Sequence, residues 1–416
     1  MELNAKRIKE IGNRDATRLT NGLVRVVVDD KGGMIPELSY WRENGYLNTH
    51  WLPHFRSNSG RAYSKTIDSG YWGSELLYEI AGNFPCVPNF GLPGKANGVE
   101  YPQHGTTSNK KWKLLKSGVL ANRAAYAVST LKGERTNEFT YKKYDILLEG
   151  HPVHYAVLKV RSHFQKPARI TAAWHNTLGS PFLEKGCLID VSASRFATVP
   201  SPSEFDTGSR IAVGTEFTSL SRAPLRNGKN GDIRLVPGMI GYSDFCTGSV
   251  PRTARLGWSS VVNPSLKSIY MCYFKGPAAA GERDLILYFN DLWMQYGGRK
   301  FTPWASSAEG SDMTFCLGTE NSVGAFANGI QYSLAHPELL GNPTSVEILP
   351  GAEQTLYYAS LAAEYSASKL QNGVAKVEID KGAIAVVGRS GSGTGIQKIK
   401  ADPSFAEIER IVSELG

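Results

Sequence analysis

Two histidines stand in segments of the chain where catalytic side chains are often mounted. His104 lies in a proline- and glycine-rich stretch that leads into a predicted strand, and His175 follows a predicted strand over residues 169–174. A loop at a strand end holds a side chain on a rigid scaffold, and imidazole exchanges protons near neutral pH. The two positions therefore suggest acid–base chemistry, although a single histidine in such a setting is more often structural.

A series of short motifs around these histidines is similar to that of a known family. HGTTSNKKW (104–112) resembles the His-Gly-x-x-Arg-Asn-x-x-Trp motif of aldose 1-epimerases and hexose-6-phosphate mutarotases, and WHNTLGSPF (174–182) resembles their second histidine motif. YSDF (242–245) falls where those enzymes place a sugar-binding aspartate, and FCLGTEN (315–321) resembles the strand that bears their catalytic glutamate. The order and approximate spacing hold from residue 20 to residue 362, so the chain resembles the galactose mutarotase-like superfamily over most of its length.

The resemblance implies a reaction and the residues that carry it. In mutarotation a base takes the proton of the anomeric hydroxyl while an acid protonates the ring oxygen, and the roles reverse when the ring recloses. By resemblance, Glu320 is the base, His175 is the acid, and His104 hydrogen-bonds the sugar and stabilises the developing charge. Acid–base catalysis of this kind contributes roughly 10²- to 10⁴-fold in rate. The reaction needs no cofactor and no metal, and the implied partner is a small-molecule carbohydrate.

The same motifs contain candidates for binding the sugar. By resemblance, Asp244 grips sugar hydroxyls, and Asn109 and Asn176, which lie within the two histidine motifs, are further candidates for binding the sugar. Trp112 or Trp174 could supply an apolar face for the sugar ring, but a tryptophan buried in the core is the more common role for either.

Two departures from the family pattern bear on the substrate and on the base. Aligned without a gap, the family's glutamate falls on Gly318, two residues before Glu320; positions 318 and 320 share one face of a strand. The family's arginine after His-Gly is replaced within residues 106–108 by threonines and a serine. Because arginine is the usual bidentate partner of phosphate, this loss argues for an unphosphorylated sugar. Arg56 or Arg61, both in the loop over residues 48–61, is a candidate replacement.

Many short strand signals position these residues. The runs 23–28, 139–148, 153–160, 169–174, 256–262, 268–274, 284–289, 313–317 and 354–361 are rich in β-branched and aromatic residues and are bounded by turn formers. Few stretches have helical periodicity, and no repeat of fixed period is present. We therefore predict an all-β fold, a large antiparallel β-sandwich of the galactose mutarotase-like type with a short C-terminal α-helical appendage.

The last fifty residues differ from the rest. We expect a β-sandwich domain over residues 1–365 and a C-terminal appendage over residues 366–416. In the appendage Asp402 can cap a helix whose first position is Pro403. The apolar residues that follow lie on one face of that helix and predict that it packs on the sandwich or on a partner: Phe405, Ile408, Ile411, Val412 and Leu415.

Composition excludes several other classes of protein. The net charge is +8, but lysines and arginines are scattered along the chain, which does not favour a nucleic-acid partner. The five cysteines are spread singly, a pattern typical of reduced thiols in a cytoplasmic protein. No apolar run is long enough for a membrane span, and the charged N-terminal segment shows no secretory signal. The sequence does not indicate an oligomeric state.

Three hypotheses for the function remain open at this point. The first is an aldose 1-epimerase-like isomerase that acts on an unphosphorylated sugar. The second is a non-catalytic carbohydrate-binding or sugar-sensing protein that keeps the fold without the chemistry. The third is a related carbohydrate lyase or hydrolase, because one scaffold can support several reactions.

Overall fold

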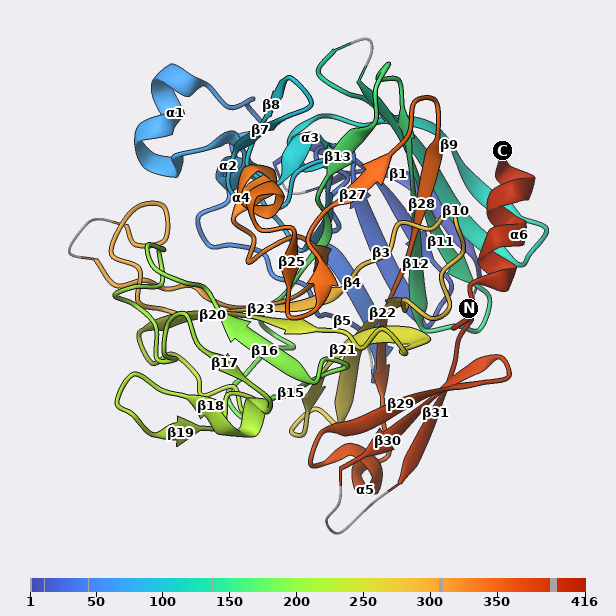
Figure 1. Ribbon diagram of the computed structural model, residues 1–416. Coiled ribbons are helices and arrows are strands. Elements are labelled where there is room, and N and C mark those ends of the chain that lie inside the picture. The colour runs from blue at the N-terminus through green and yellow to red at the C-terminus, as the bar shows by residue number, and fades with distance from the viewer. Residues whose placement is uncertain (1, 11, 44, 136–137, 307–309, 390–394) are drawn as a thin grey trace.

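The chain folds mainly into antiparallel β-sheets, as the strand signals predict. The computed structural model describes residues 2–10, 12–43, 45–135, 138–306, 310–389 and 395–416. Three large sheets form the body of the molecule, and a smaller sheet and a helix from the C-terminal segment lie against it (Figure 1). This arrangement confirms the predicted fold class.

An eight-stranded sheet runs through the centre of the molecule. Its strands, in spatial order, are β15 (Leu188–Val191), β21 (Leu256–Asn263), β22 (Ser268–Lys275), β28 (Glu353–Glu364), β12 (Val153–Ser162), β11 (Phe139–Leu148), β10 (Ala124–Lys132) and β9 (Lys113–Leu120). Successive side chains of a strand point to opposite faces. In β12, Ala156 and Leu158 join one apolar core, whereas Tyr155 and Val157 join another. Both faces of this sheet are therefore covered.

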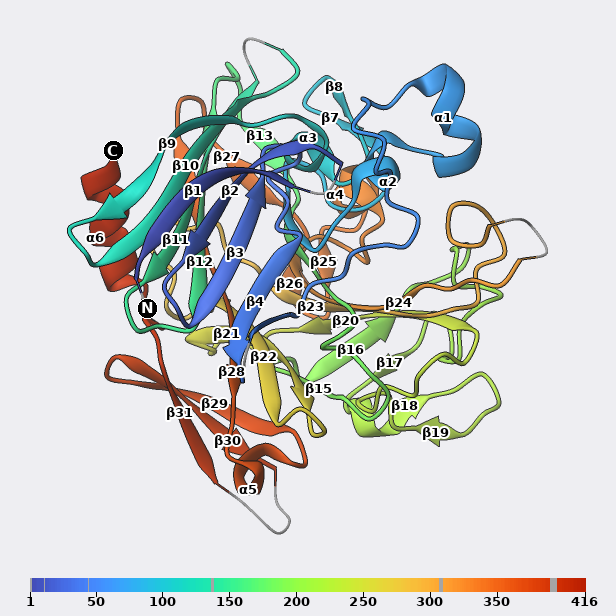
Figure 2. The ribbon, with the colours of Figure 1, turned by 180° about the vertical axis from the view of Figure 1, so that it is seen from behind.

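Two further sheets cover one face of the central sheet. A five-stranded meander, seen in front in Figure 2, contains β1 (Asn4–Glu10), β2 (Arg14–Thr20), β3 (Val24–Asp29), β4 (Glu37–Arg42) and β5 (Gly45–Asn48). A seven-stranded sheet has the order β17 (Glu216–Phe217), β16 (Arg195–Thr198), β20 (Tyr242–Ser249), β23 (Phe289–Tyr296), β24 (Phe315–Val323), β14 (Ala172–Leu178) and β6 (Asn83–Cys86). Both sheets pack on the central sheet through one continuous apolar core.

The C-terminal segment covers the other face of the central sheet. It forms the strands β29 (Val374–Asp380), β30 (Ala383–Gly388) and β31 (Ile396–Lys400), and the helices α5 (Ala367–Leu370) and α6 (Ala406–Leu415). The apolar face predicted for the last helix is buried against the sheet. The helix begins at Ala406, with Phe405 as its N-cap residue, and not at Pro403 as predicted. Asp402 Oδ2 still accepts hydrogen bonds from the backbone N–H groups of Glu407 and Ile408 in the first turn, at 2.8 and 3.2 Å.

The remaining elements are short and lie mostly in the connections. The helices are α1 (Lys65–Trp72), α2 (Glu75–Glu79), α3 (Gly105–Asn109), α4 (Gly329–Ala335) and the 3₁₀ turn η1 (Leu220–Arg222). The small strand pairs are β7 (Gly94–Ala96) with β8 (Val99–Tyr101), β13 (Ala168–Ile170) with β27 (Val346–Ile348), β18 (Ala223–Pro224) with β19 (Asn230–Gly231), and β25 (Glu338–Leu339) with β26 (Asn342–Pro343). In the described ranges, none of the helices has the length and apolar composition that a membrane crossing needs.

Candidate active site

A row of side chains crosses the face of the seven-stranded sheet that is turned away from the central core. Thr247 pairs with Asp291 across β20 and β23, Asp291 pairs with Glu320 across β23 and β24, and His175 pairs with Phe84 across β14 and β6. The register of β14 with β24 on either side of His175 sets this residue opposite Glu320. Directly opposed residues point to the same face. The pairing of the strands therefore brings the predicted acid and base together.

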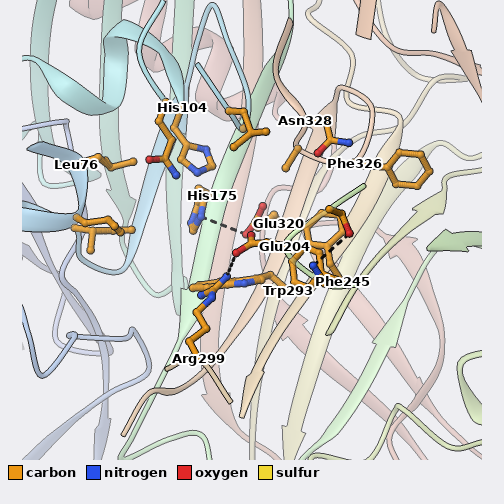
Figure 3. Close-up of a pocket in the computed structure, with 18 of the residues that line it drawn as sticks. Leu76, His104, His175, Glu204, Phe245, Trp293, Arg299, Glu320, Phe326 and Asn328 are labelled. Atoms are coloured by element: carbon orange, nitrogen blue, oxygen red, sulfur yellow. Dashed lines mark hydrogen bonds and ion pairs between the residues drawn. The ribbon is translucent and has the colours of Figure 1, made fainter. Parts of the chain in front are cut away.

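The side chains of His175 and Glu320 lie next to each other. The Nε2 atom of His175 is 3.3 Å from Oε1 of Glu320, and both side chains are buried (Figure 3). The other ring nitrogen of His175, Nδ1, is 3.1 Å from the hydroxyl of Thr177, and Phe84 stacks on the ring at 4.5 Å. These contacts fix the imidazole so that Nε2 faces the carboxyl group.

His104 reaches the same place from outside the sheet. It lies just before α3 in the left-handed conformation, with φ of 59°, and its ring meets that of His175 edge to face at 4.8 Å. Its Nδ1 atom is 3.5 Å from Sγ of Cys86. His104 therefore precedes a short helix where the sequence suggested a loop leading into a strand, and His175 lies inside β14, where the sequence suggested its end.

The absence of a side chain at Gly318 leaves room for the carboxyl group of Glu320. A Cβ atom on Gly318 would stand 2.7 Å from Oε1 of Glu320 and 3.0 Å from Cβ of Trp293. The Glu320 carboxyl group thus leans over position 318 and fills the space that a side chain there would take. The two-residue offset of the sequence is compensated by this orientation.

Burial shifts the pKa values of the acidic and histidine side chains in this row. Desolvation, with a smaller contribution from Asp291, raises the pKa of Glu320 well above its usual value. Desolvation, and then the neighbouring His104, hold the pKa of His175 well below its usual value, and desolvation lowers the pKa of His104 to about 3. Burial likewise raises the pKa of Asp291 to about 7. An uncharged carboxyl beside an uncharged imidazole is therefore favoured near neutral pH.

These groups open into a cavity of about 340 Å³. Its walls are mainly aromatic and aliphatic, and a few polar side chains converge on it. The lining includes Leu76, Phe205, Phe245, Trp293, Trp304 and Phe326, together with His104, His175, Glu320, Gln103, Asn328, Glu204 and Arg299. Apolar walls with a few placed polar groups are typical of small-molecule sites. Among the described residues, neither this cavity nor any other part of the structure contains three His, Cys, Asp or Glu side chains placed to bind a metal ion.

Two charged residues predicted to bind substrate do not line this cavity. Asp244 lies on the opposite face of β20, where its carboxylate accepts hydrogen bonds from Arg210, the closest to the guanidinium at 2.5 Å. Arg56 is buried between Glu10 and Asp29, at 2.8 and 3.2 Å. Both charges are satisfied within the fold and serve its stability.

The predicted asparagines and tryptophans also lie elsewhere. Asn109 closes α3 by donating to backbone carbonyls of the preceding turn, and Asn176 donates to Thr319 at 2.7 Å behind the sheet. Trp112 and Trp174 belong to the core between the sheets. For both tryptophans the structure favours the buried core role that the sequence left open.

The aromatic and charged walls of the cavity were missed at the sequence level. Trp293 comes from β23, and the sequence placed a strand over residues 284–289, which ends where β23 begins. Residues 284–288 are not part of a strand. They make an isolated bridge between Asp284 and Thr355 and backbone hydrogen bonds from Leu285 to Thr355 and from Tyr288 to Ser322. Arg299 and Trp304 follow β23, in a segment that carries no sequence motif.

Comparison with known proteins shows similarity in structure. No family model matches the chain, and no curated protein matches it in sequence. A proposed aldose 1-epimerase from Klebsiella pneumoniae is similar over 85% of this chain and 81% of its own, with 13% identity and a TM-score of 0.59. A galactose mutarotase-like protein from Clostridium acetobutylicum covers 88% of this chain and 99% of its own, with 12% identity and a TM-score of 0.57. A galactose mutarotase related enzyme from Lactobacillus acidophilus covers 84% and 97%, with 13% identity and a TM-score of 0.52.

Proposed function

Because the chain has the galactose mutarotase-like fold, we propose that it is an aldose 1-epimerase-like isomerase that interconverts the anomers of an unphosphorylated sugar. The observation that carries this proposal is the 3.3 Å approach of His175 Nε2 to Glu320 Oε1 at a cavity lined by aromatic side chains and a few polar groups. A paired acid and base are what ring opening of a hemiacetal requires.

The buried pair can generate both catalytic forms by moving one proton. When the carboxyl proton of Glu320 passes to Nε2 of His175, the products are a carboxylate base and an imidazolium acid. The carboxylate then takes the proton of the anomeric hydroxyl, and the imidazolium protonates the ring oxygen as the bond between it and the anomeric carbon breaks. The aldehyde rotates and the ring closes with the roles reversed, so protons and electrons balance over the cycle.

His104 has a supporting role in this scheme. Its ring lies against that of His175 at 4.8 Å, and burial keeps it uncharged. A neutral imidazole can donate one hydrogen bond to the sugar without repelling the imidazolium that forms on its neighbour. His104 therefore orients the anomeric oxygen and stabilises charge that develops there.

The charge of the cavity supports an unphosphorylated substrate. Among the described residues that line it, Arg299 is the one cation, and it already carries an ion pair with Glu204 at 2.6 Å. A phosphate dianion is usually held by several donors that include a bidentate arginine. Arg56, a candidate from the sequence for that task, lies outside the cavity.

The proposal is tested by the rate of anomer exchange in fresh α-glucose and α-galactose, followed by exchange NMR or polarimetry. We expect His175→Ala and Glu320→Gln each to lower turnover by at least about 10²-fold. Glu216→Gln is the control, because Glu216 is an exposed carboxylate of the same sheet, 65% accessible in its side chain. Circular dichroism checks that the fold persists.

The same experiment separates the competing functions. Wild-type turnover in both variants would reject the assigned pair. A wild-type protein that binds the sugars without accelerating exchange would instead be a carbohydrate-binding protein.

A further inference from the structure

Arg299 is a buried cation in the wall of the cavity. Only 8% of the residue is accessible. Its guanidinium carbon lies 4.2 Å from the ring centre of Trp304 and 5.4 Å from that of Trp293. Its backbone N–H donates to Asp312 at 3.1 Å, which holds the start of this loop. A buried cation in contact with two indoles has lost most of its water and needs a strong anionic partner.

The anionic partner of Arg299 within the chain is Glu204, which is far more exposed than Arg299 itself. Nη2 of Arg299 donates to Oε2 of Glu204 at 2.6 Å, yet the Glu204 side chain is 55% accessible and stands on the connection between β16 and β17. The Nη1 atom of Arg299 is buried and has no hydrogen-bond partner in the part of the chain that is described. A guanidinium normally takes a carboxylate through two parallel hydrogen bonds. This one uses a single nitrogen, on a half-exposed carboxylate.

Arg299 and the His175–Glu320 pair are spaced so that a sugar at the pair could reach Arg299 with a substituent of its ring. The ring of Trp293 lies between them, with its centre 6.0 Å from that of His175 and 5.4 Å from the guanidinium carbon of Arg299. An indole face is the kind of surface on which a sugar ring lies. A pyranose on this wall, with its anomeric carbon at His175 and Glu320, extends its substituents towards Arg299.

We propose, building on the isomerase function above, that Arg299 binds the carboxylate of a hexuronate and that this carboxylate displaces Glu204. In a hexuronate the carboxylate is attached to C5, on the other side of the ring oxygen from the anomeric carbon. The guanidinium of Arg299 already binds one carboxylate, that of Glu204, so it can bind the carboxylate of a ligand in the same way. The single cation and the surrounding aromatic walls match a planar monoanion and do not match a phosphate dianion.

Binding is measured through the tryptophan fluorescence of the protein, because Trp293 and Trp304 flank the guanidinium. Wild-type protein is titrated with glucuronate, galacturonate, glucose, galactose and glucose 6-phosphate. We expect each uronate to bind roughly 10- to 100-fold more tightly than its parent hexose, the range of a charge-assisted hydrogen bond. Glucose 6-phosphate should show no such gain.

Two variants and a control complete the test. Arg299→Gln should abolish the preference for uronates, and Glu204→Gln should tighten uronate binding because it removes the competing carboxylate. Arg195→Gln is the control, since Arg195 forms an exposed pair with Glu216 on the same sheet.

Each possible outcome decides the proposal. Equal binding of uronates and hexoses, a preference for the phosphate, a preference that survives in Arg299→Gln, or weaker uronate binding in Glu204→Gln would each overturn it. Tight uronate binding without accelerated anomer exchange would leave this inference standing and refute the isomerase.

Discussion

At the scale of single residues, the absence of a side chain at position 318 is as important as the presence of one at position 320. The carboxyl group of Glu320 occupies the space above Gly318, with Oε1 2.7 Å from where a Cβ would stand. This is why a glutamate displaced by two residues from the family pattern can still face His175.

Gly318→Ala should therefore disturb the acid–base pair. The added methyl group would force the Glu320 carboxyl away from Nε2 of His175, and a misplacement of about 1 Å can cost on the order of 10² in rate. We expect turnover in the anomer-exchange assay to fall by about 10- to 100-fold, with the fold retained. Gly70→Ala is the control, because a Cβ there meets no atom within 4 Å. Wild-type turnover in Gly318→Ala would show that the carboxyl group does not work from its present place.

The sequence predicted that three residues share one site but did not predict their surroundings. His104, His175 and Glu320 were proposed because their motifs follow the order of the family they resemble, and the structure places them together. Asp244 was proposed from the place of its motif in the family's order. Because all of β20 after Tyr242 is buried, alternation along the strand could not show that Asp244 faces away from the cavity. Its neighbour Phe245 lines the cavity instead.

At the scale of elements, the strand β23 contributes Trp293 to the cavity, and the sequence did not predict this strand over its full length. All eight residues of Phe289–Tyr296 are buried, so the segment shows no alternation of apolar and polar residues. The preceding run of residues 284–289 is almost entirely apolar, yet before β23 begins at Phe289 it makes only an isolated bridge and a few backbone hydrogen bonds. Periodicity reports burial, whereas membership of a sheet depends on partners distant in the sequence.

Asp291 of β23 should make the stability of the protein depend on pH. Burial raises its pKa from 3.8 to about 7, so the folded state prefers the protonated form. The resulting stability is fully present below about pH 4 and is lost as the pH rises through 7, by up to about 1.4 kcal/mol per pH unit. Asp291→Asn cannot ionise. Its one oxygen can accept from one of the two hydroxyls that now donate to Asp291, those of Thr247 and Ser322, and its amide NH2 can donate to the other.

The melting temperature of Asp291→Asn relative to wild type should therefore rise between pH 5 and pH 8. Asp15→Asn is a suitable control, because the pKa of Asp15 is lowered to about 2 by Lys9 and Lys111. Asp15 is thus ionised throughout that range, and the difference between this variant and wild type should stay constant. A difference for Asp291→Asn that does not change with pH would contradict the assigned burial of a protonated carboxyl group.

At the scale of the whole molecule, the apolar layers that stabilise the fold are separate from the sheet face that carries the cavity. The C-terminal sheet and α6 cover one face of the central sheet, the apolar core lies on its other face, and the cavity lies beyond the seven-stranded sheet. The boundary expected near residue 365 remains a prediction, but the residues that follow it bury a continuous apolar surface against β11, β12 and β22.

Ile411→Ala should weaken this covering layer without altering the cavity. Ile411 is fully buried in α6, and truncating such a side chain costs about 2–5 kcal/mol, since it loses buried apolar contact and leaves a void. Urea unfolding should show that loss, whereas Ser413→Ala on the exposed side of the same helix should change the free energy of unfolding by less than about 0.5 kcal/mol. Because two sheets lie between α6 and the His175–Glu320 pair, anomer exchange below the melting temperature should equal that of wild type. A large loss of turnover in folded Ile411→Ala would show that the C-terminal layer and the cavity are coupled through the core.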